Sequence, residues 1–162
     1  MYLGKYCPGC GGGFGNQSCA IAKCSLKHDQ VEYCFQCRDF PCSMFDGAED
    51  YDSFITHQRQ LADLARAQKI SIAAYNEEQV RKSEILMTLL SQFDDGRRKT
   101  FYCVAINLLP LPDIEIALQQ IADYLTADNL TIKEKADLVV SQFQALAGQQ
   151  GIELKLRKKK KA

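Results

Sequence analysis

Apolar residues recur at intervals of three and four along most of the chain after about residue 45, which is the spacing of helices that bury one side. The first such pattern runs from Tyr51 to Ala67, and Asp50 or Asp52 is available as its N-cap. We expect a helix here, with an apolar face made by Phe54, Leu61, Leu64 and Ala65.

A second helix is indicated between Asn76 and Gly96. Asn76 and Gln79 have the spacing of a capping box, and Gly96 follows two aspartates as the natural stop. The apolar stripe between these two ends consists of Val80, Leu86, Met87, Leu89, Leu90 and Phe93.

Two prolines separate the next two predicted helices. The segment from Phe101 to Leu109 has apolar residues at helical spacing, and Pro110 and Pro112 close it because proline cannot continue a helix. We expect it to be the central helix. The helix after the prolines has the clearest periodicity in the chain, carried by Ile114, Ala117, Leu118, Ile121 and Leu125.

The last predicted helix begins at a capping box. Thr131 and Glu134 have the required spacing, and Gly148 is the expected C-terminal stop. Its apolar stripe is made by Ile132, Ala136, Val139, Val140, Phe143 and Leu146.

These patterns predict a mainly α protein. Its N-terminal cysteine-rich region, residues 1–45, has little regular structure and packs on a bundle of about five helices, residues 46–148. Residues 149–162 form a basic C-terminal tail, in which Ile152, Leu154 and Leu156 alternate with charged residues and could form a short strand.

Size and composition fit a globular protein of one domain, since 46% of the 162 residues are hydrophobic. The segment from Met1 to Cys10 has no apolar run that could serve as a signal peptide, and no stretch approaches the roughly 18 apolar residues of a membrane helix. We therefore expect a cytoplasmic protein that makes no membrane contact.

Charge is unevenly distributed along the chain. The formal net charge is zero, but six basic residues fall between Lys155 and Lys161, so residues 1–154 hold fourteen Lys/Arg against twenty Asp/Glu, a charge of −6. An acidic body is unfavourable for a nucleic-acid-binding face. Nucleic acid is thus an unlikely partner except through weak contact with the tail, which otherwise is expected to be solvated and disordered.

Seven of the eight cysteines lie in the first 42 residues, and this cluster indicates a metal site. In a reducing cytoplasm disulfides are uncommon, and an odd number of clustered thiols cannot all pair. Two Cys-x-x-Cys pairs have the spacing at which one turn presents two sulfurs to a tetrahedral zinc ion. The candidate ligands are Cys7, Cys10, Cys19, Cys24, Cys34, Cys37 and Cys42.

The spacing leaves the sharing of these ligands open. The pair Cys7/Cys10 can join Cys34/Cys37 in one site, as the two knuckles of a zinc ribbon do, or it can join the next two cysteines of the sequence. With His28 the region offers eight donors, enough for two four-coordinate zinc ions, although His28 alone reads as a surface histidine.

Other uses of the thiols remain as alternatives. The sequence Cys7-Pro8-Gly9-Cys10 is similar to a redox dithiol, but it lacks the flanking strand and helix of such a site. An iron-sulfur cluster uses the same thiolates, with cysteine spacings different from those of the common ferredoxins. Cys103 lies within an apolar helical pattern and is expected in the core.

The order of the cysteines resembles that of a known family. Cys19 and Cys24 are separated by four residues, a Cys-x-x-Cys pair follows, and a Phe-Pro-Cys element ends at Cys42. This arrangement is similar to that of the cysteine-rich bacterial and archaeal family catalogued as domain of unknown function 3795, and the similarity extends from residue 6 to about 125 through Asp52–His57 and Asp95–Lys99. The resemblance implies a small intracellular, metal-binding protein without an assigned reaction.

No arrangement of acids, bases or nucleophiles typical of catalysis stands out in the helical part, so we name no catalytic residue and leave enzymatic activity uncertain. The leading hypothesis is a protein with one or two structural zinc ions whose surface binds a protein partner, since four thiolates leave no position for a reactive water. The alternatives are an iron-sulfur or dithiol redox protein or sensor, and a zinc-ribbon nucleic-acid binder.

Overall fold

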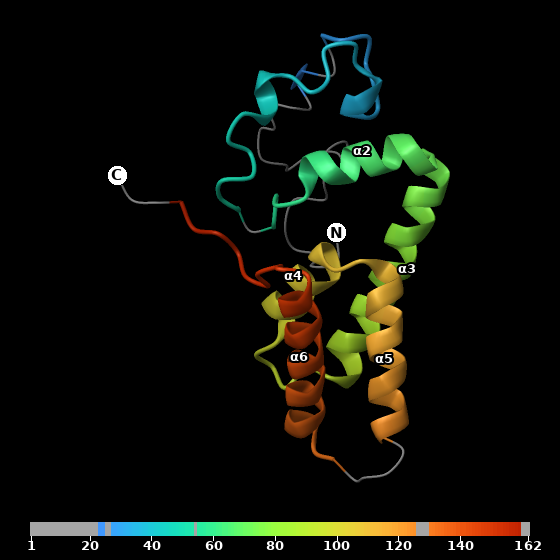
Figure 1. Cartoon of the computed structure of the whole chain (residues 1–162), viewed down its shortest axis with the longest axis vertical. Helices are drawn as coiled ribbons and strands as arrows, with labels where there is room; N and C mark the ends of the chain where they lie inside the picture. The colour runs from blue at the N-terminus through green and yellow to red at the C-terminus, as the bar shows by residue number, and fades with distance from the viewer. Residues whose placement is uncertain (1–22, 25–26, 54, 126–129, 160–162) are drawn as a thin grey trace.

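The computed structural model describes residues 23–24, 27–53, 55–125 and 130–159. It is mainly helical, as predicted, and the described residues contain no strand. Figure 1 shows α2 lying across one end of a bundle formed by the later helices, with the cysteine-rich region on the far side of α2. The helices are α2 (Gln60–Ile70), α3 (Ile72–Gln92), α4 (Lys99–Leu108), α5 (Leu111–Leu125) and α6 (Ile132–Gln149).

The first predicted helix starts later than the pattern indicated, because Asp52 has another role. Its carboxylate accepts hydrogen bonds from the backbone N–H of His57 at 2.6 Å and of Arg157 at 2.7 Å, and from Nε2 of Gln58 at 3.0 Å. The segment before α2 is therefore a loop tied to the C-terminal segment, and α2 begins only at Gln60.

A single residue separates α2 from α3. Ser71 has φ 82°, a left-handed conformation that turns the chain sharply, and its Oγ accepts a hydrogen bond from Ala74 N–H at 3.3 Å. Arg66 on α2 and Glu78 on α3 form a paired ion contact across this bend. Ser71 is thus the N-cap of α3, and the expected capping box at Asn76 lies inside the helix.

The turn between α3 and α4 is organised by Asp94. One oxygen of its carboxylate accepts hydrogen bonds from Gly96 N–H at 3.0 Å and Arg98 N–H at 2.9 Å. Gly96 has φ 89°, which glycine adopts without strain. The glycine therefore shapes the turn, while the helix itself ends earlier, at Gln92.

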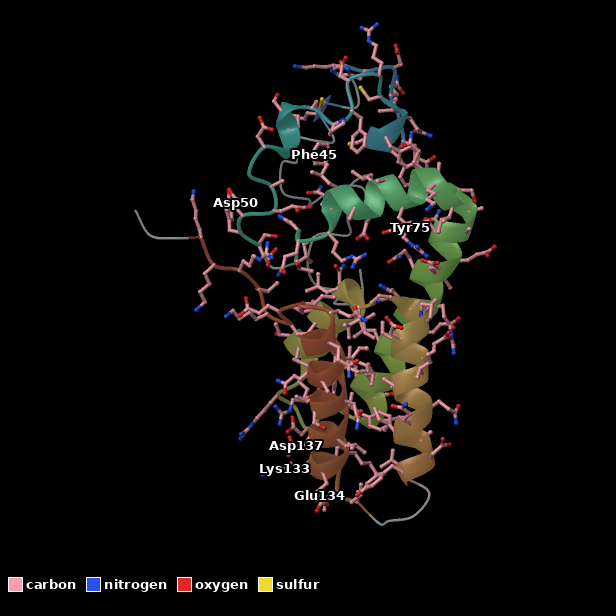
Figure 2. All side chains as sticks on the ribbon, viewed as in Figure 1. Phe45, Asp50, Tyr75, Lys133, Glu134 and Asp137 are labelled. Atoms are coloured by element: carbon pink, nitrogen blue, oxygen red, sulfur yellow. The ribbon has the colours of Figure 1, made fainter. Side chains whose placement is uncertain are left out.

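The capping box predicted for the last helix is confirmed. Glu134 N–H donates to Oγ1 of Thr131 at 3.3 Å, and Thr131 N–H donates to the Glu134 carboxylate at 2.8 Å. Figure 2 shows Glu134 at the lower end of α6, where the helix starts. The helix continues through Gly148, the expected stop, and the left-handed residue that follows it is Gly151, with φ 66°.

The core lies between α3, α4, α5 and α6. The ring of Tyr102 is completely buried there, and its hydroxyl donates a hydrogen bond to the carbonyl of Phe93 at 2.7 Å. The other members of this core cluster are Ile85, Leu89, Ala105, Ile106, Leu109, Ile114, Ala117, Ile121, Val139, Phe143 and Ala147.

The helical periodicity of the sequence predicted the buried face of α3 only in part. Val80 and Met87, which the pattern assigned to the apolar stripe, are 60% and 53% exposed, whereas Ile85 is buried. Leu86 and Leu90 pack at the edge of the core. The buried face of α3 is therefore rotated toward the side that meets α4.

The first part of the C-terminal tail is docked on the protein through Ile152 and Leu154, so the expectation of a disordered end is wrong there, while the basic residues Lys155 and Arg157 to Lys159 are exposed to solvent as expected. Ile152 and Leu154 pack against the core, without forming the strand that their alternation suggested. The guanidinium of Arg157 donates to the carbonyl of Glu49 at 2.9 Å, and Lys159 lies 5.3 Å from the centre of the Tyr51 ring.

We predict that Asp52→Ala destabilises the protein by about 1–3 kcal/mol, because three donors lose a charged acceptor. Urea unfolding of this variant measures the loss. Asp46→Ala is the control, since Asp46 is an exposed carboxylate of the same segment, and it should unfold like the parent. Equal stability of the two variants would contradict the role given to Asp52.

The effect of Asp52→Ala should also depend on pH. Burial raises the pKa of Asp52, but the hydrogen bonds from the backbone of His57 and Arg157 and from the side chains of Gln58 and Thr56 together lower the pKa below its ordinary value of 3.8. A lowered carboxyl pKa stabilises the fold above the ordinary pKa, and this stabilisation disappears as the pH falls through the folded-state pKa. The difference between parent and variant should be full near neutral pH and shrink in acid.

Candidate metal centre

A short 3-10 turn, η1 (Cys34–Gln36), brings the second Cys-x-x-Cys pair together. Cys37 N–H donates to the carbonyl of Cys34 at 3.0 Å, and Tyr33 N–H donates to the Gln36 side chain at 2.9 Å. The turn packs against α2, and Asn76 of α3 donates to the Tyr33 hydroxyl at 3.4 Å. The helices therefore hold this knuckle in place.

A second turn, η2 (Ser43–Phe45), places an aromatic ring beneath the cysteines. Phe45 is 6% exposed and meets the ring of Phe40 edge-on, with centroids 5.7 Å apart. In Figure 2 Phe45 lies on the side of the cysteine-rich region nearest α2. It is the one buried residue among those described before Asp46, so this region has almost no apolar core of its own.

The chain reverses direction immediately after His28. Asp29 and Gln30 have φ values of 54° and 55°, and Val31 N–H donates to the carbonyl of His28 at 3.3 Å. Two successive left-handed residues other than glycine are uncommon. This tight turn sets His28 opposite the segment that contains Cys37.

One pocket collects the candidate ligands of the described region. Its polar lining comes from four cysteines and one histidine, and its apolar lining from four larger side chains. The lining residues are Cys24, His28, Val31, Cys34, Cys37, Phe40, Cys42, Met44 and Phe45.

Three donor atoms in this area lie close enough together to share an ion. His28 Nδ1 is 3.5 Å from Cys37 Sγ and 3.5 Å from Asp39 Oδ2, and all three donors lie within 4.8 Å of one another. Nitrogen, sulfur and carboxylate oxygen are the three donor types that zinc accepts in proteins. The residues therefore fit a zinc ion chemically.

The structure brings together four of the seven predicted cysteine ligands, namely Cys24, Cys34, Cys37 and Cys42, around one pocket. The other three predicted ligands, Cys7, Cys10 and Cys19, lie outside the described residues. Which cysteines share an ion stays a prediction.

Cys103 is separate from this group. It lies on α4 and is partly rather than fully buried, so the prediction of a core position is only partly met. Burial raises the pKa of its thiol, which keeps it protonated and poorly reactive near neutral pH.

The sequence named His28 as a possible eighth donor, although His28 alone read as a surface histidine, and it did not point to Asp39. The available signal for Asp39 was its place two residues after Cys37, although its side chain is exposed. No signal in the sequence showed that the left-handed turn at Asp29 and Gln30 would return His28 to the same place.

Comparison with known families agrees with the resemblance noted from the cysteine order. Residues 2–47 match the family DUF3795, described as a protein of unknown function. No curated protein and no solved structure gives a significant match to the chain.

The DUF3795 match covers the whole group of seven candidate cysteines and ends at residue 47, before the loop that leads to α2 at Gln60. It therefore supports the cysteine-rich region as a unit. The further similarity through Asp52–His57 and Asp95–Lys99 lies beyond the match and stays a prediction. In the described part of the chain, no helix is both long and apolar enough to cross a membrane.

We predict that Phe45→Ala weakens the cysteine-rich region more than truncation of any other described aromatic residue before Asp46, because Phe45 is the buried ring among the described residues there. Loss of a buried phenylalanine costs roughly 3–5 kcal/mol. Hydrogen exchange of residues 28–45 measures the effect. Phe35→Ala is the control because Phe35 is only partly buried, and equal exchange in both variants would contradict the prediction.

Proposed function

We propose that this protein binds one or two zinc ions through its cysteine-rich region, and that the metal holds this region in a shape recognised by a protein partner. The observation that carries the proposal is the convergence of four cysteines and His28 on one pocket. The proposed ligands are drawn from Cys7, Cys10, Cys19, Cys24, Cys34, Cys37 and Cys42.

A structural role for the metal follows from the lack of apolar burial around it. Ordering a backbone costs about 1–2 kcal/mol for each residue, and one buried ring, that of Phe45, cannot offset this cost over more than twenty residues. Structural zinc contributes an apparent 10–16 kcal/mol in small zinc-binding peptides. Metal binding is thus a sufficient source of folding energy for this region.

The chemistry of the donors favours a quiet centre over a reactive one. When bound, a zinc ion held by four protein ligands supplies cross-linking without an open position for catalysis. The turns at Cys34 and at Ser43 hold the nearby thiols in position through the backbone alone, without a bound ion.

Exposed apolar side chains support a role in protein binding. Met44 of η2 lines the pocket and is exposed, and Tyr51 and Ile55 are exposed in the loop between η2 and α2. Exposed apolar side chains are found at many interaction surfaces. The acidic charge of residues 1–154 argues against nucleic acid as the main partner. A reducing cytoplasm is the compartment in which the thiols would stay available for metal binding.

We expect protein purified without oxygen to contain one or two equivalents of zinc and to show no visible absorption. Elemental analysis and a visible spectrum test both points on one sample. A chelator that removes the zinc should increase hydrogen exchange in residues 28–45 and leave α3 to α6 protected, because the bundle has its own core.

Brown protein that contains iron and acid-labile sulfide would show that the cofactor is an iron-sulfur cluster and not zinc. Protein purified without metal, with all thiols reduced and with residues 28–45 still protected from hydrogen exchange, would contradict a structural role for any metal.

We also predict that Cys37→Ser disorders the cysteine-rich region, while Cys103→Ser has little effect on it. Serine cannot replace a thiolate ligand, whereas Cys103 lies on α4 away from the pocket. Limited proteolysis and zinc content, measured on both variants, test the difference. Similar zinc content and protease resistance in the two variants would show that Cys37 holds no metal.

A further inference from the structure

We infer that His28 and Asp39 are ligands of the same zinc ion as Cys37, so that the centre is held by nitrogen and oxygen as well as sulfur. This inference rests on the proposed function, since it names ligands of the proposed zinc. The sequence analysis took its ligand set from the cysteines, with His28 as an eighth possible donor, and the family match assigns no ligand.

One ring nitrogen of His28 faces two possible ligand atoms. Nδ1 lies 3.5 Å from Cys37 Sγ and 3.5 Å from Asp39 Oδ2. The separation from sulfur suits a hydrogen bond, but a single N–H can point at only one acceptor, and 3.5 Å exceeds the roughly 2.7–3.2 Å of a nitrogen–oxygen hydrogen bond. A cation shared by the three groups accounts for both contacts at once.

The same distances are those of neighbouring corners of a zinc tetrahedron. Zinc–nitrogen and zinc–oxygen bonds of about 2.0–2.2 Å and zinc–sulfur bonds of about 2.3 Å place adjacent ligand atoms roughly 3.4–3.6 Å apart. Both separations from Nδ1 of His28, to Cys37 and to Asp39, are 3.5 Å.

A simple surface ion pair between His28 and Asp39 explains less. Their side chains are 36% and 52% exposed, and exposed pairs contribute only about 0–1 kcal/mol. Such a weak contact cannot be what holds the two residues together. Backbone turns position them instead, through the left-handed residues after His28 and the bond from Phe40 N–H to the carbonyl of Cys37 at 3.2 Å.

A mixed donor set also restricts the metal. Iron-sulfur clusters are held mainly by thiolates, whereas a site with one nitrogen, one oxygen and one sulfur donor suits a zinc(II) or cobalt(II) ion. The other thiolates that line the pocket, those of Cys24, Cys34 and Cys42, are the candidates for a fourth donor, and one of them would have to move closer to the three grouped atoms to complete the site.

Cobalt(II) provides a readout of the donor atoms that does not require any activity. The full chain is stripped of metal, titrated with cobalt(II), and its absorption recorded, because sulfur ligands give intense charge-transfer bands and donor exchange shifts the weaker visible bands. Zinc affinity is then measured by competition. The variants are His28→Ala and Asp39→Ala, and the controls are His57→Ala, which removes the other histidine of the chain, and Asp46→Ala.

We expect both site variants to shift the visible bands and to weaken zinc binding by more than the roughly 10–100-fold that loss of an outer hydrogen-bond partner costs. The controls should match the parent. If His28→Ala fails to fold, His28→Cys decides the matter, since a ligand position would keep the metal and gain the charge-transfer intensity of one more thiolate.

Unchanged spectra and affinity in His28→Ala and Asp39→Ala, or a His28→Cys variant without added charge-transfer intensity, would overturn the mixed site. Zinc binding by the parent would then still support the proposed function. A parent that binds neither zinc nor cobalt, or that carries an iron-sulfur cluster, would overturn both.

Discussion

Very little apolar surface is buried among the described residues before Asp46, and the proposed role of the metal follows from that constraint. Between residues 27 and 46 the chain makes tight turns at Asp29, Cys34 and Ser43, with only Phe45 buried beneath them. Such a segment needs an energy source other than the hydrophobic effect. The cysteines, together with His28 and Asp39, are the groups in this segment that can provide one by binding metal.

The helical part, by contrast, is stabilised by burial of apolar side chains. Four helices share one apolar core, with Tyr102 and Phe143 fully buried within it. The two parts meet through α2, which packs against η1 on one side and against α3 on the other. Among the described residues, the hydrogen bond between Tyr33 and Asn76 is one of the contacts that link the two parts.

The sequence was informative wherever a local rule acts alone. The capping box at Thr131 and the spacing from Ile114 to Ile121 gave a helix start and a buried face that the structure reproduces. Prediction failed where a residue had a distant partner. Asp52 has the spacing of an N-cap, but its carboxylate accepts a hydrogen bond from the backbone of Arg157. His28 alone read as a surface residue, but it contacts Cys37 across a turn that the neighbouring residues do not predict.

The bond between Asp52 and the backbone of Arg157 joins residues 105 positions apart in the chain. Closing so long a loop is entropically costly until the intervening helices have folded and brought the ends together. The loop before α2 should therefore acquire its final form late in folding, after the bundle. Under the proposed function, the cysteine-rich region would bind its metal ion independently of this late step, because none of its proposed ligands lies in that loop.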